Sequence, residues 1–330
     1  MMAILITGAA GFIGFHVCQA LLKKQKSIIG VDNLNDYYNL NLKKARLNNI
    51  KKSYPNTFNF YQIDISNQPQ LKNLIQQYDD IEFVIHLAAQ VGVRYSLINP
   101  QAYVSSNILG HLNLLEAFKD YKKLRHFVYA SSSSVYGNTK KDVFTINDPV
   151  NTPLTFYSVS KITNELTSYA YQYLYNIPST GLRFFTVYGP WGRPDMAVYN
   201  FTKSIFAGQP IKLFNHGKMK RDFTYVDDIV QGIMSILSKP PKHTKQPFHS
   251  IYNLGAGQSQ PLIRLVRLIE KTSNKKAKII YEPIQPGEIV KTQADISETQ
   301  RQFNYNPKIS LEQGIPLFIK WFCDYHKISI

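Results

Sequence analysis

Apolar residues occur in short runs that alternate with amphipathic stretches through the first half of the chain. The run from Ala3 to Thr7 leads into a glycine-rich turn, and helical spacing of apolar positions follows from Phe15 to Lys24. Short apolar runs are typical of buried strands, and spacings of three and four residues are typical of the helices that cover them. Because strands and helices alternate so regularly, we expect an α/β fold with a doubly wound parallel sheet. The further predicted elements are strands at 27–31, 58–63, 83–87, 126–130 and 179–184, and helices at 42–52, 68–78, 99–119 and 157–175.

The alternation lapses near residue 184. Glycines and prolines crowd the segment 185–196, which predicts a shaped loop rather than a helix or strand. We expect a sheet-based domain at residues 1–183, to which segments around 223–256 return, and a smaller C-terminal α/β lobe at 184–330 that binds the substrate. The elements predicted beyond the loop are strands at 211–214 and 223–226, helices at 228–237, 262–271 and 311–325, and an exposed loop at 240–247.

Three glycines, Gly8, Gly11 and Gly14, lie between the first strand and the first helix. Glycines at this place let the backbone approach a pyrophosphate, and the helix N-terminus offers free N–H groups and positive potential. The second strand leads to Asp32, whose carboxylate can accept hydrogen bonds from both ribose hydroxyls of NAD and would repel the 2′-phosphate of NADP. These features predict a Rossmann-type site for NAD. The glycine spacing differs from the usual dinucleotide fingerprint, so a plain tight turn and a solvent-facing acid are the alternatives.

The ends of five predicted strands carry residues suited to one common site. Gly8, Asp32, Asp64, Ala88 and Ser131 all stand at such ends. In a doubly wound sheet the ligand lies beyond the carboxyl edge of the strands. The convergence of these residues is stronger evidence for a ligand site than any one of them.

A tyrosine and a lysine, Tyr157 and Lys161, stand four residues apart at the start of the helix after the fifth strand. Residues four apart share one face of a helix. A lysine ammonium beside a phenol favours the phenolate, so we expect the pKa of Tyr157 to lie below its ordinary value of about 10. Such a pair can act as a general base that removes a proton from an alcohol. The spacing also occurs by chance, and its place after the serine run 131–134 is what favours catalysis.

The composition is that of a globular protein that works inside the cell. The chain has 330 residues, 44% of them apolar, so it can bury a large core. No apolar run reaches 18 residues, which predicts no integral membrane segment. The N-terminus enters the first strand without a basic signal-peptide region, and two cysteines are too few for a disulfide framework or a thiolate zinc site. We therefore expect a cytoplasmic protein without a bound metal.

The formal charge is +16, from 38 Lys and Arg against 22 Asp and Glu. A nucleic-acid binder or a protein attracted to membrane surfaces is one interpretation of such a charge. The lysines are scattered, as in Lys23-Lys24 and Lys275-Lys276, rather than gathered in one arm. Distributed charge favours a lysine-rich surface with a site for an anionic substrate, and we expect no nucleic-acid partner.

Longer blocks of the sequence resemble one enzyme family. With the glycine turn, Ser132 and the Tyr157/Lys161 pair, they make the whole chain similar to the extended short-chain dehydrogenases/reductases. More narrowly the chain resembles the NAD-dependent nucleotide-sugar 4-epimerases, and most closely the UDP-glucuronate 4-epimerases. The resemblance also implies a homodimer formed through the helices at Asn107 and Tyr157. The blocks are 32–38, 92–96, 130–137, 181–196 and 218–224.

The resemblance implies a role for each candidate residue. Tyr157 would be the base, Lys161 its electrostatic partner, and Ser132 a hydroxyl that shares the proton on the sugar O4. NAD contacts are implied for Gly8, Gly11, Phe12, Ile13, Gly14, Asp32, Asn33, Asn35, Asp64, Ile65, Ala88, Ala89, Gln90, Asn107, Ser131, Tyr157, Lys161 and Phe184. Contacts with the UDP-sugar substrate are implied for Arg94, Ser132, Ser133, Ser134, Tyr157, Thr186, Arg193, Leu213, Phe214, Asn215, Arg221 and Glu288.

A glucuronate substrate adds a chemical hazard. Its 4-keto form is a β-keto acid, which loses carbon dioxide most readily when the carboxyl bond stands perpendicular to the carbonyl plane. An epimerase must therefore hold the carboxylate away from that alignment. Arg193, with Thr186, Ser133 and Ser134, is the candidate clamp, since an arginine fork suits a carboxylate. A loop ion pair between Arg193 and Asp195 is the alternative.

Several other functions remain open from the sequence. A UDP-glucose/UDP-galactose 4-epimerase is the first alternative, but relatives with that substrate carry an arginine about where Gln285 stands, so the grip on the diphosphate rests more on Arg221. A UDP-glucuronate decarboxylase is close in chemistry. Sugar-nucleotide dehydratases place Asp-Glu where this chain has Ser133-Ser134. A non-catalytic binder on the same fold would be expected to lose the base, which is intact.

Overall fold

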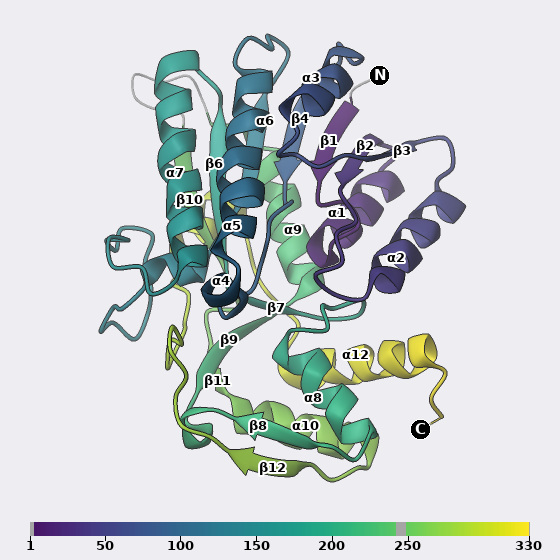
Figure 1. Ribbon diagram of the computed structural model, residues 1–330, viewed down its shortest axis with the longest axis vertical. Coiled ribbons are helices and arrows are strands. Elements are labelled where there is room, and N and C mark those ends of the chain that lie inside the picture. The colour runs from purple at the N-terminus through teal and green to yellow at the C-terminus, as the bar shows by residue number, and fades with distance from the viewer. Residues whose placement is uncertain (1–2, 242–248, 330) are drawn as a thin grey trace.

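A seven-stranded parallel sheet fills the upper half of the computed structural model (Figure 1). The structure describes residues 3–241 and 249–329. The strands are β1 (Ala3–Thr7), β2 (Ser27–Asp32), β3 (Phe58–Gln62), β4 (Ile81–His86), β5 (His126–Ser132), β6 (Ser179–Phe184), β7 (Thr186–Tyr188), β8 (Pro210–Leu213), β9 (Lys220–Tyr225), β10 (His249–Leu254), β11 (Ser259–Pro261) and β12 (Lys278–Tyr281). The helices are α1 (Phe12–Lys23), α2 (Leu40–Ser53), α3 (Gln68–Gln76), α4 (Tyr95–Ile98), α5 (Pro100–Tyr103), α6 (Gly110–Phe118), α7 (Phe156–Tyr175), α8 (Ala197–Phe206), α9 (Val226–Leu237), α10 (Leu262–Ser273), α11 (Ser297–Phe303) and α12 (Leu311–His326), with a π-helical segment η1 (Val104–Leu109) and 3-10 segments η2 (Ser133–Tyr136) and η3 (Asn215–Gly217).

The strand order of the large sheet is β10-β6-β5-β4-β1-β2-β3. The chain proceeds outward from β1 in one direction through β2 and β3, and in the other through β4, β5 and β6. A crevice opens at the carboxyl edge where the two directions part, which is the usual ligand position in this architecture. All five residues of β1 are buried, as expected for a parallel strand covered on both faces.

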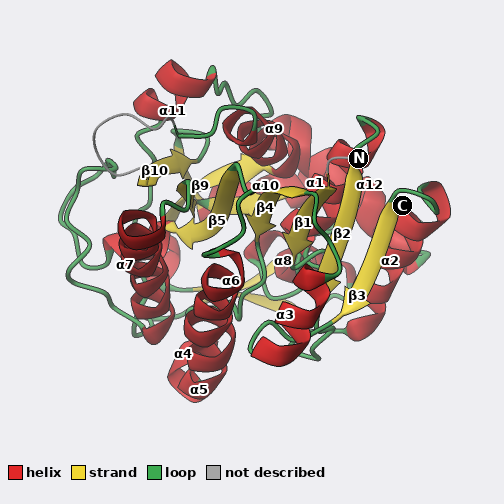
Figure 2. Cartoon of the chain, turned by 90° about the horizontal axis from the view of Figure 1, so that it is seen from above, coloured by secondary structure: helices red, strands yellow, loops and turns green. Residues whose placement is uncertain are grey.

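Helices cover both faces of the large sheet (Figure 2). On one face α6 packs against α3 and α7, and on the other α1 packs against α2 and α9. The Rossmann-type, doubly wound α/β fold expected from the alternation is confirmed.

The lower half consists of two small sheets and their helices (Figure 1). Strands β11, β9 and β7 form one sheet, and β12 and β8 form the other. Helix α10 packs against α8 and α12. The two halves share one apolar core, because Phe12 and Phe15 of α1 belong to the same cluster as Phe318 and Phe322 of α12. The two walls of a cavity between the halves are therefore supported by the same apolar core.

The predicted elements of the first half are all present, with ends shifted by a few residues. The single helix predicted for 99–119 is wrong in detail, because the π-helical segment Val104–Leu109 interrupts it. This segment allows Asn107 to form hydrogen bonds with the Gln90 backbone that no local pattern encodes. The loop predicted for 185–196 contains the short strand β7, which pairs with β9.

Some elements of the second half had no predicted counterpart. Helices α8 and α11 and strands β10, β11 and β12 belong to this group. Strand β10 pairs in parallel with β6 and so becomes the edge of the large sheet. Residues 242–247 of the loop predicted for 240–247 lie outside the described residues. Within 3–241 and 249–329, no helix has the length and apolarity to cross a membrane.

Candidate active site

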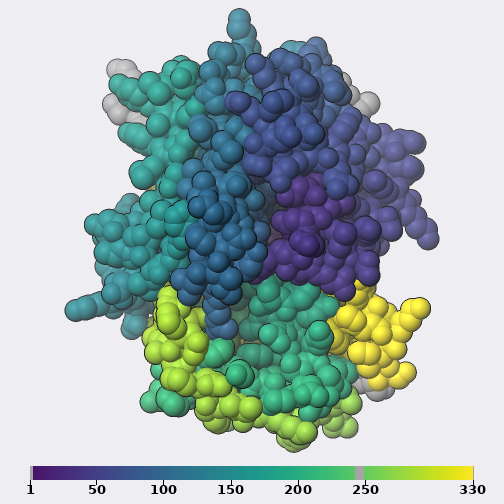
Figure 3. Space-filling view, viewed as in Figure 1, coloured from purple at the N-terminus to yellow at the C-terminus, as the bar shows by residue number. Residues whose placement is uncertain are grey.

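A cavity of about 850 Å³ lies between the carboxyl edge of the large sheet and the lower half of the molecule. Its walls come from the glycine turn after β1, from the ends of the neighbouring strands, from the start of α7, and from segments around 185–204, 210–223 and 287–292. Figure 3 shows a recess between the blue and purple residues above and the green residues below. In the described parts of the chain no group of three His, Cys, Asp or Glu side chains is placed to hold a metal ion.

The glycine turn after β1 leaves no room for side chains. Gly8 has a φ of +74°, and a Cβ atom there would lie 2.7 Å from the backbone nitrogen of Ala88. A Cβ atom on Gly14 would lie 2.1 Å from the carbonyl oxygen of Gly8. Helix α1 begins directly behind this turn at Phe12. The exposed backbone and the helix N-terminus together form a cradle that fits a pyrophosphate.

Asp32 at the end of β2 is tied to the glycine turn. Its Oδ2 accepts a hydrogen bond from the Ala10 N–H at 3.1 Å, and its Oδ1 accepts one from the Leu34 N–H at 2.9 Å. Burial raises the pKa of Asp32, and Lys43 opposes that shift. The carboxylate lines the cavity beside the glycine turn, where it can accept hydrogen bonds from the two hydroxyls of a ribose.

Asp64 lies next to Asp32 along the sheet edge and is held by its neighbours. Asn33 Nδ2 donates to its Oδ2 at 2.8 Å, and the N–H and hydroxyl of Ser66 donate to its Oδ1. Burial acts to raise the pKa of Asp64, but these hydrogen bonds outweigh burial and the pKa is lowered. Asp64 and Ile65 thus form an ordered wall at one end of the cavity.

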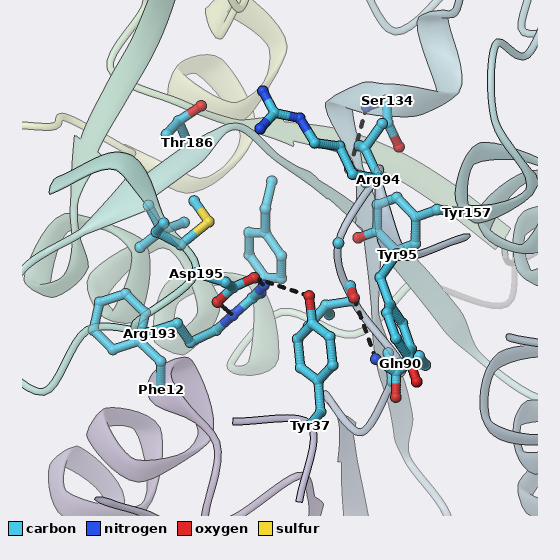
Figure 4. A pocket seen from close by; sticks show the side chains of 18 of the residues that line it. Phe12, Tyr37, Gln90, Arg94, Tyr95, Ser134, Tyr157, Thr186, Arg193 and Asp195 are labelled. Atoms are coloured by element: carbon cyan, nitrogen blue, oxygen red, sulfur yellow. Dashed lines mark hydrogen bonds and ion pairs between the residues drawn. The ribbon is translucent and has the colours of Figure 1, made fainter. Parts of the chain in front are cut away.

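Tyr157 stands in the first turn of α7. The helix begins there because the Thr155 hydroxyl accepts a hydrogen bond from the Ser158 N–H at 3.3 Å. Figure 4 shows the Tyr157 hydroxyl pointing into the cavity. Lys161, one turn later, also lines the cavity and is 2% exposed. The spacing has therefore placed both side chains at one site, as expected.

The pKa of Tyr157 differs from the expectation. Burial raises it above the ordinary value, while a hydrogen bond with Ser132 and the charge of Arg193 act in the opposite direction. Lys161 Nζ donates to the carbonyl of Ala130 at 2.9 Å, and burial lowers the pKa of Lys161 to about 8. The predicted lowering of the Tyr157 pKa is wrong for this structure, since the desolvation of the partly buried phenol outweighs the hydrogen bond with Ser132 and the charge of Arg193.

The serines at the end of β5 differ in their hydrogen-bond partners. Ser131 Oγ donates to Glu165 at 2.5 Å and thus faces α7. Ser132 Oγ accepts a hydrogen bond from the Ser134 N–H at 3.2 Å. The buried Ser134 hydroxyl has no hydrogen-bond partner among the described residues. A buried hydroxyl in this state is suited to receive a polar group of a ligand, because it would otherwise remain unsatisfied.

Arg193 and Asp195 form an ion pair on the wall opposite Tyr157 (Figure 4). Arg193 donates to the carboxylate from Nε and Nη2, and the Tyr37 hydroxyl donates to the same carboxylate at 3.3 Å. The neighbouring Asp195 raises the pKa of Arg193, although burial acts against this, so the guanidinium is charged at every working pH. In the described residues no acceptor engages Nη1 of Arg193. The ion pair with Asp195, which was the alternative to a carboxylate clamp, is thus present. The Nη1 edge of the guanidinium is still able to donate to a second carboxylate.

A second charged group lies at the lower wall. Glu288 accepts hydrogen bonds from Arg221 at 2.9 Å and from Arg94 at 2.9 and 3.1 Å. The Arg94 guanidinium also stacks over the ring of Phe214 at 4.2 Å. Two arginines that share one carboxylate keep a net positive charge, which suits an anion such as a diphosphate. Arg94 supplies a second cation on this wall, whereas Gln285 only donates to the nearby carbonyl of Pro283.

Most of the candidate residues meet at the cavity. Three do not line it: Asn107, Leu213 and Asn215. Asn107 lies behind the cavity wall, where its amide bonds both backbone groups of Gln90. Leu213 is fully buried beneath Phe214, which does line the cavity. The candidate residues on the wall are Gly8, Gly11, Phe12, Ile13, Gly14, Asp32, Asn33, Asn35, Asp64, Ile65, Ala88, Ala89, Gln90, Arg94, Ser131, Ser132, Ser133, Ser134, Tyr157, Lys161, Phe184, Thr186, Arg193, Phe214, Arg221 and Glu288.

Other wall residues had no predicted role. Tyr37 and Lys43 come from the segment after β2, Tyr95 from α4, and Asn200 from α8. Tyr37 lies inside one of the blocks that resembled the epimerases, so that signal could have found it. Asn200 could not be found, because the helix that carries it had not been predicted.

The arrangement is suited to the oxidation of an alcohol. A buried phenol and a serine hydroxyl face the cavity beside a cationic lysine, which are the groups needed to remove a hydroxyl proton. A phosphate cradle and a ribose-binding acid lie at one end, and a diphosphate-sized cationic group lies at the other. The cavity can therefore hold a dinucleotide and a second anionic ligand end to end.

Comparisons with known proteins agree with this geometry. A profile of the NAD dependent epimerase/dehydratase family matches residues 4–255. The UDP-glucuronate 4-epimerase of Thermodesulfobacterium geofontis is 45% identical over 318 residues, which cover 96% of this chain and 95% of that protein. The structure of a UDP-glucuronic acid 4-epimerase from Bacillus cereus, in complex with UDP-glucuronic acid and NAD, superimposes with a TM-score of 0.89 at 36% identity and covers 98% of this chain and 100% of that one. A UDP-glucose 4-epimerase from Thermotoga maritima, solved with UDP-glucose, gives a TM-score of 0.87 at 27% identity and covers 98% and 100%.

Proposed function

Because the chain belongs to the NAD dependent epimerase/dehydratase family, we propose that it is a UDP-glucuronate 4-epimerase that interconverts UDP-glucuronate and UDP-galacturonate. The observation that carries this conclusion is the near full-length likeness to UDP-glucuronate 4-epimerases at 36–45% identity. The T. maritima UDP-glucose 4-epimerase is less similar, at 27%. The recognition of the family from the sequence is thus confirmed.

NAD is the cofactor, and the upper part of the cavity fits it. The glycine turn would hold its pyrophosphate, Asp32 its adenosine ribose, and Asp64 and Ile65 its adenine. When bound, NAD accepts a hydride from C4 of the sugar and returns it. Because the same cofactor is regenerated in each turnover, the enzyme needs no external reductant, and tight retention of the dinucleotide is expected.

We assign the proton transfer to three side chains. Tyr157 takes the proton from the sugar O4 hydroxyl, and Ser132 shares that proton through its hydrogen bond with the phenol. Lys161 would anchor the nicotinamide ribose and add positive charge beside Tyr157. Inversion at C4 follows when the flat 4-keto sugar presents its other face before the hydride returns.

The sugar carboxylate would lie against Arg193 and the serine run. Arg193 has a free Nη1 among the described groups, and the unpartnered Ser134 hydroxyl and Thr186 line the same cavity. A carboxylate held by these donors would be kept in one orientation relative to the keto group. This contact is what separates a uronate epimerase from a decarboxylase.

The UDP part would occupy the lower wall. Arg221 and Arg94 are the two cations available to the diphosphate, and Phe214 offers a ring face to uracil. Glu288 accepts from both arginines and could turn to a ribose hydroxyl once the diphosphate neutralises them. Arg94 would thus supply the second cationic contact with the diphosphate that relatives obtain from an arginine at the position of Gln285.

The most direct test is to incubate the purified protein with UDP-glucuronate and to identify the product by NMR. We expect UDP-galacturonate. A UDP-pentose with carbon dioxide would indicate a decarboxylase, and faster conversion of UDP-glucose into UDP-galactose would indicate the other epimerase. Ultraviolet absorbance of the denatured, deproteinised sample should show dinucleotide that was carried through purification.

We also propose a homodimer in the cytoplasm. Helix α7 exposes a stripe of apolar side chains, with Leu166 at 66% and Tyr173 at 73% exposure, and Leu109 of the neighbouring η1 is 43% exposed. Such a patch on two adjacent helices is typical of a subunit interface. Cys18 and Cys323 are both buried and unpaired, which is consistent with a reducing compartment.

A further inference from the structure

The guanidinium of Arg46 is buried without a carboxylate partner. Arg46 stands on α2, is 0% exposed, and forms no ion pair within 3–241 and 249–329. Its Nη1 donates to the carbonyl of Ala10 at 2.9 Å, and its Nη2 donates to the carbonyls of Trp191 at 2.6 Å and Gly192 at 3.4 Å. A charge removed from water is unfavourable unless polar groups surround it, and for Arg46 these groups are the three carbonyls, the Tyr38 hydroxyl and, through its charge, the Asp32 carboxylate.

These hydrogen bonds join two parts of the cavity wall. Ala10 belongs to the glycine turn, and its N–H donates to Asp32. Trp191 and Gly192 directly precede Arg193 in the chain. A single side chain therefore links the turn that would hold the cofactor to the residue that would hold the sugar carboxylate.

The loop before Arg193 depends on such outside support. Trp191 has a φ of +62°, which is unfavourable for a residue with a bulky side chain. His16 of α1 forms a second tie, with its Nε2 at 2.9 Å from the carbonyl oxygen of Pro190. The Trp191 ring packs against Phe15 at 5.2 Å between ring centres. The conformation of this loop is thus set by α1 and α2 rather than by its own sequence.

The same segment of the chain also reaches the Arg193 ion pair. Tyr37, nine residues before Arg46, donates to Asp195 across the cavity (Figure 4). Tyr38 accepts a hydrogen bond from Arg46 Nη1 at 2.7 Å. The segment that follows Asp32 therefore contacts the loop both before Arg193, through Arg46, and after it, through Tyr37.

We infer that Arg46 is a positioning residue that fixes Arg193 and thereby keeps the sugar carboxylate from being lost. This inference rests on the proposed function. Arg46 does not line the cavity and cannot touch the substrate, so it would act only through the loop 190–193. Its hydrogen bonds to Trp191 and Gly192 on one side and to Ala10 on the other tie that loop to the glycine turn.

The reaction that Arg46 would suppress is the decarboxylation of the 4-keto uronate. In that step the C5–C6 bond breaks, its electron pair passes into the C4 carbonyl to form an enolate, carbon dioxide leaves, and a proton returns to C5. A shift of Arg193 by about 1 Å would let the carboxylate turn toward the perpendicular alignment, and misplacements of this size can change rates by roughly 10²-fold.

The test compares Arg46→Met with Lys44→Met, which removes an exposed cation from the same helix. Each variant receives UDP-glucuronate labelled at C6, and the ratio of released carbon dioxide to UDP-galacturonate is measured together with the melting temperature. We expect Arg46→Met to raise that ratio by roughly tenfold or more, given the sensitivity of oriented reactions to small shifts. Lys44→Met should keep the wild-type ratio.

Arg46→Lys provides a second measurement if the methionine variant does not fold. Lysine keeps the charge but lacks the planar fork that reaches several carbonyls at once, so the ratio should again rise. A ratio that stays at the wild-type value in a folded Arg46 variant, whatever its melting temperature, would show that Arg46 only stabilises the fold and would overturn the inference. Wild-type protein that makes no UDP-galacturonate would instead overturn the proposed function, so the two failures are distinguishable.

Discussion

At the scale of single residues, the proposed function assigns the removal of the substrate proton to the Tyr157 hydroxyl. Replacing Tyr157 with phenylalanine removes the base but retains the ring that packs against Tyr103 at 6.0 Å. We expect turnover to fall by roughly 10²–10⁴-fold, the usual contribution of a general base. NAD should stay bound, since the ring does not carry its phosphates, and this is measured from the absorbance of released nucleotide. Turnover near the wild-type value would exclude Tyr157 as the base.

Two opposite charges near Tyr157 offer a matched pair of pH experiments. Arg193 lowers the pKa of Tyr157 and Asp195 raises it, on top of the larger rise caused by burial. Removing the cation disfavours the phenolate, so Arg193→Ala should move the rising limb of the profile of kcat/KM against pH to higher pH. Asp195→Asn removes the anion and should move the same limb to lower pH. A limb that stays at the wild-type pH in both variants would show that neither charge affects the Tyr157 pKa.

The site residues that could be predicted from the sequence are those whose position relative to a strand end or a helix is clear from the neighbouring residues. The glycine turn, Asp32 and the Tyr157/Lys161 spacing follow from strand ends and helix periodicity. The roles of Arg46 and Tyr37 depend on contacts with residues about 145 and 158 positions away. The residues next to Arg46 and Tyr37 in the sequence give no sign of these contacts. The shift of the Tyr157 pKa was mispredicted for the same reason, because burial is a property of the folded molecule.

At the scale of elements, the first turn of α1 packs so closely on the turn after β1 that Gly14 has no room for a methyl group. A Cβ atom on Gly14 would meet the Gly8 carbonyl oxygen at 2.1 Å, so Gly14→Ala must push the turn out of shape. We expect loss of bound NAD, measured by absorbance and by fluorescence titration. Gly208→Ala is a suitable control, because a φ of +65° strains an alanine there while open space surrounds the added methyl group, and Gly208 does not line the cavity. Retention of NAD by Gly14→Ala would show that the turn does not hold the pyrophosphate.

Strand β9 anchors the lower half of the molecule through one buried carboxylate. Asp222 is 0% exposed and accepts hydrogen bonds from the N–H groups of Ala256, Gly257 and Ala294. An asparagine there would turn an amide N–H₂ toward backbone donors and leave buried groups unpaired. We expect Asp222→Asn to lower the free energy of unfolding by about 1–3 kcal/mol, measured by urea denaturation. Asp324→Asn, on an exposed site of α12, should change it little, and equal effects of the two variants would refute the anchoring role.

The elements that sequence predicted least well are those fixed by partners rather than by periodicity. Strand β7 has three residues and exists because Thr186–Tyr188 pairs with β9. The π-helical segment η1 departs from ordinary helical spacing to aim Asn107 at Gln90. Short strands and helix irregularities carry little local signal, and tertiary contacts decide them.

At the scale of the whole molecule, the large sheet was predictable because strict alternation of strands and helices permits few arrangements. The first six strands have the order β6-β5-β4-β1-β2-β3, which is the usual order of this architecture. Segments around 223–256 were expected to return to this domain, but no strand was predicted at 249–254, and the place of β10 at the edge beside β6 has no local signal. The cavity lies between the large sheet and the second half. The residues of its lower wall were predicted only from the family resemblance, because the pattern of apolar and polar residues gave no sign of them.

The proposed dimer tests whether the exposed face of α7 has a partner. Leu166→Asp places a charge in the apolar stripe that also contains Tyr173 and Leu174. In a two-fold interface each substitution is present twice, so desolvating both carboxylates should prevent association. We expect wild-type protein to sediment as a dimer and Leu166→Asp as a monomer, while Leu317→Asp, an exposed apolar position on α12, should remain dimeric.

The same variant separates assembly from catalysis. Tyr157 and Lys161 line the cavity from the first two turns of α7. The exposed stripe begins at Leu166, on the side of α7 away from the sheet. A monomeric Leu166→Asp should therefore keep bound NAD and turnover within several-fold of wild type, apart from any loss of stability. A monomeric mass for the wild type would contradict the dimer, whereas a folded monomer without activity would mean that the partner subunit orders the first turn of α7 and with it the position of Tyr157.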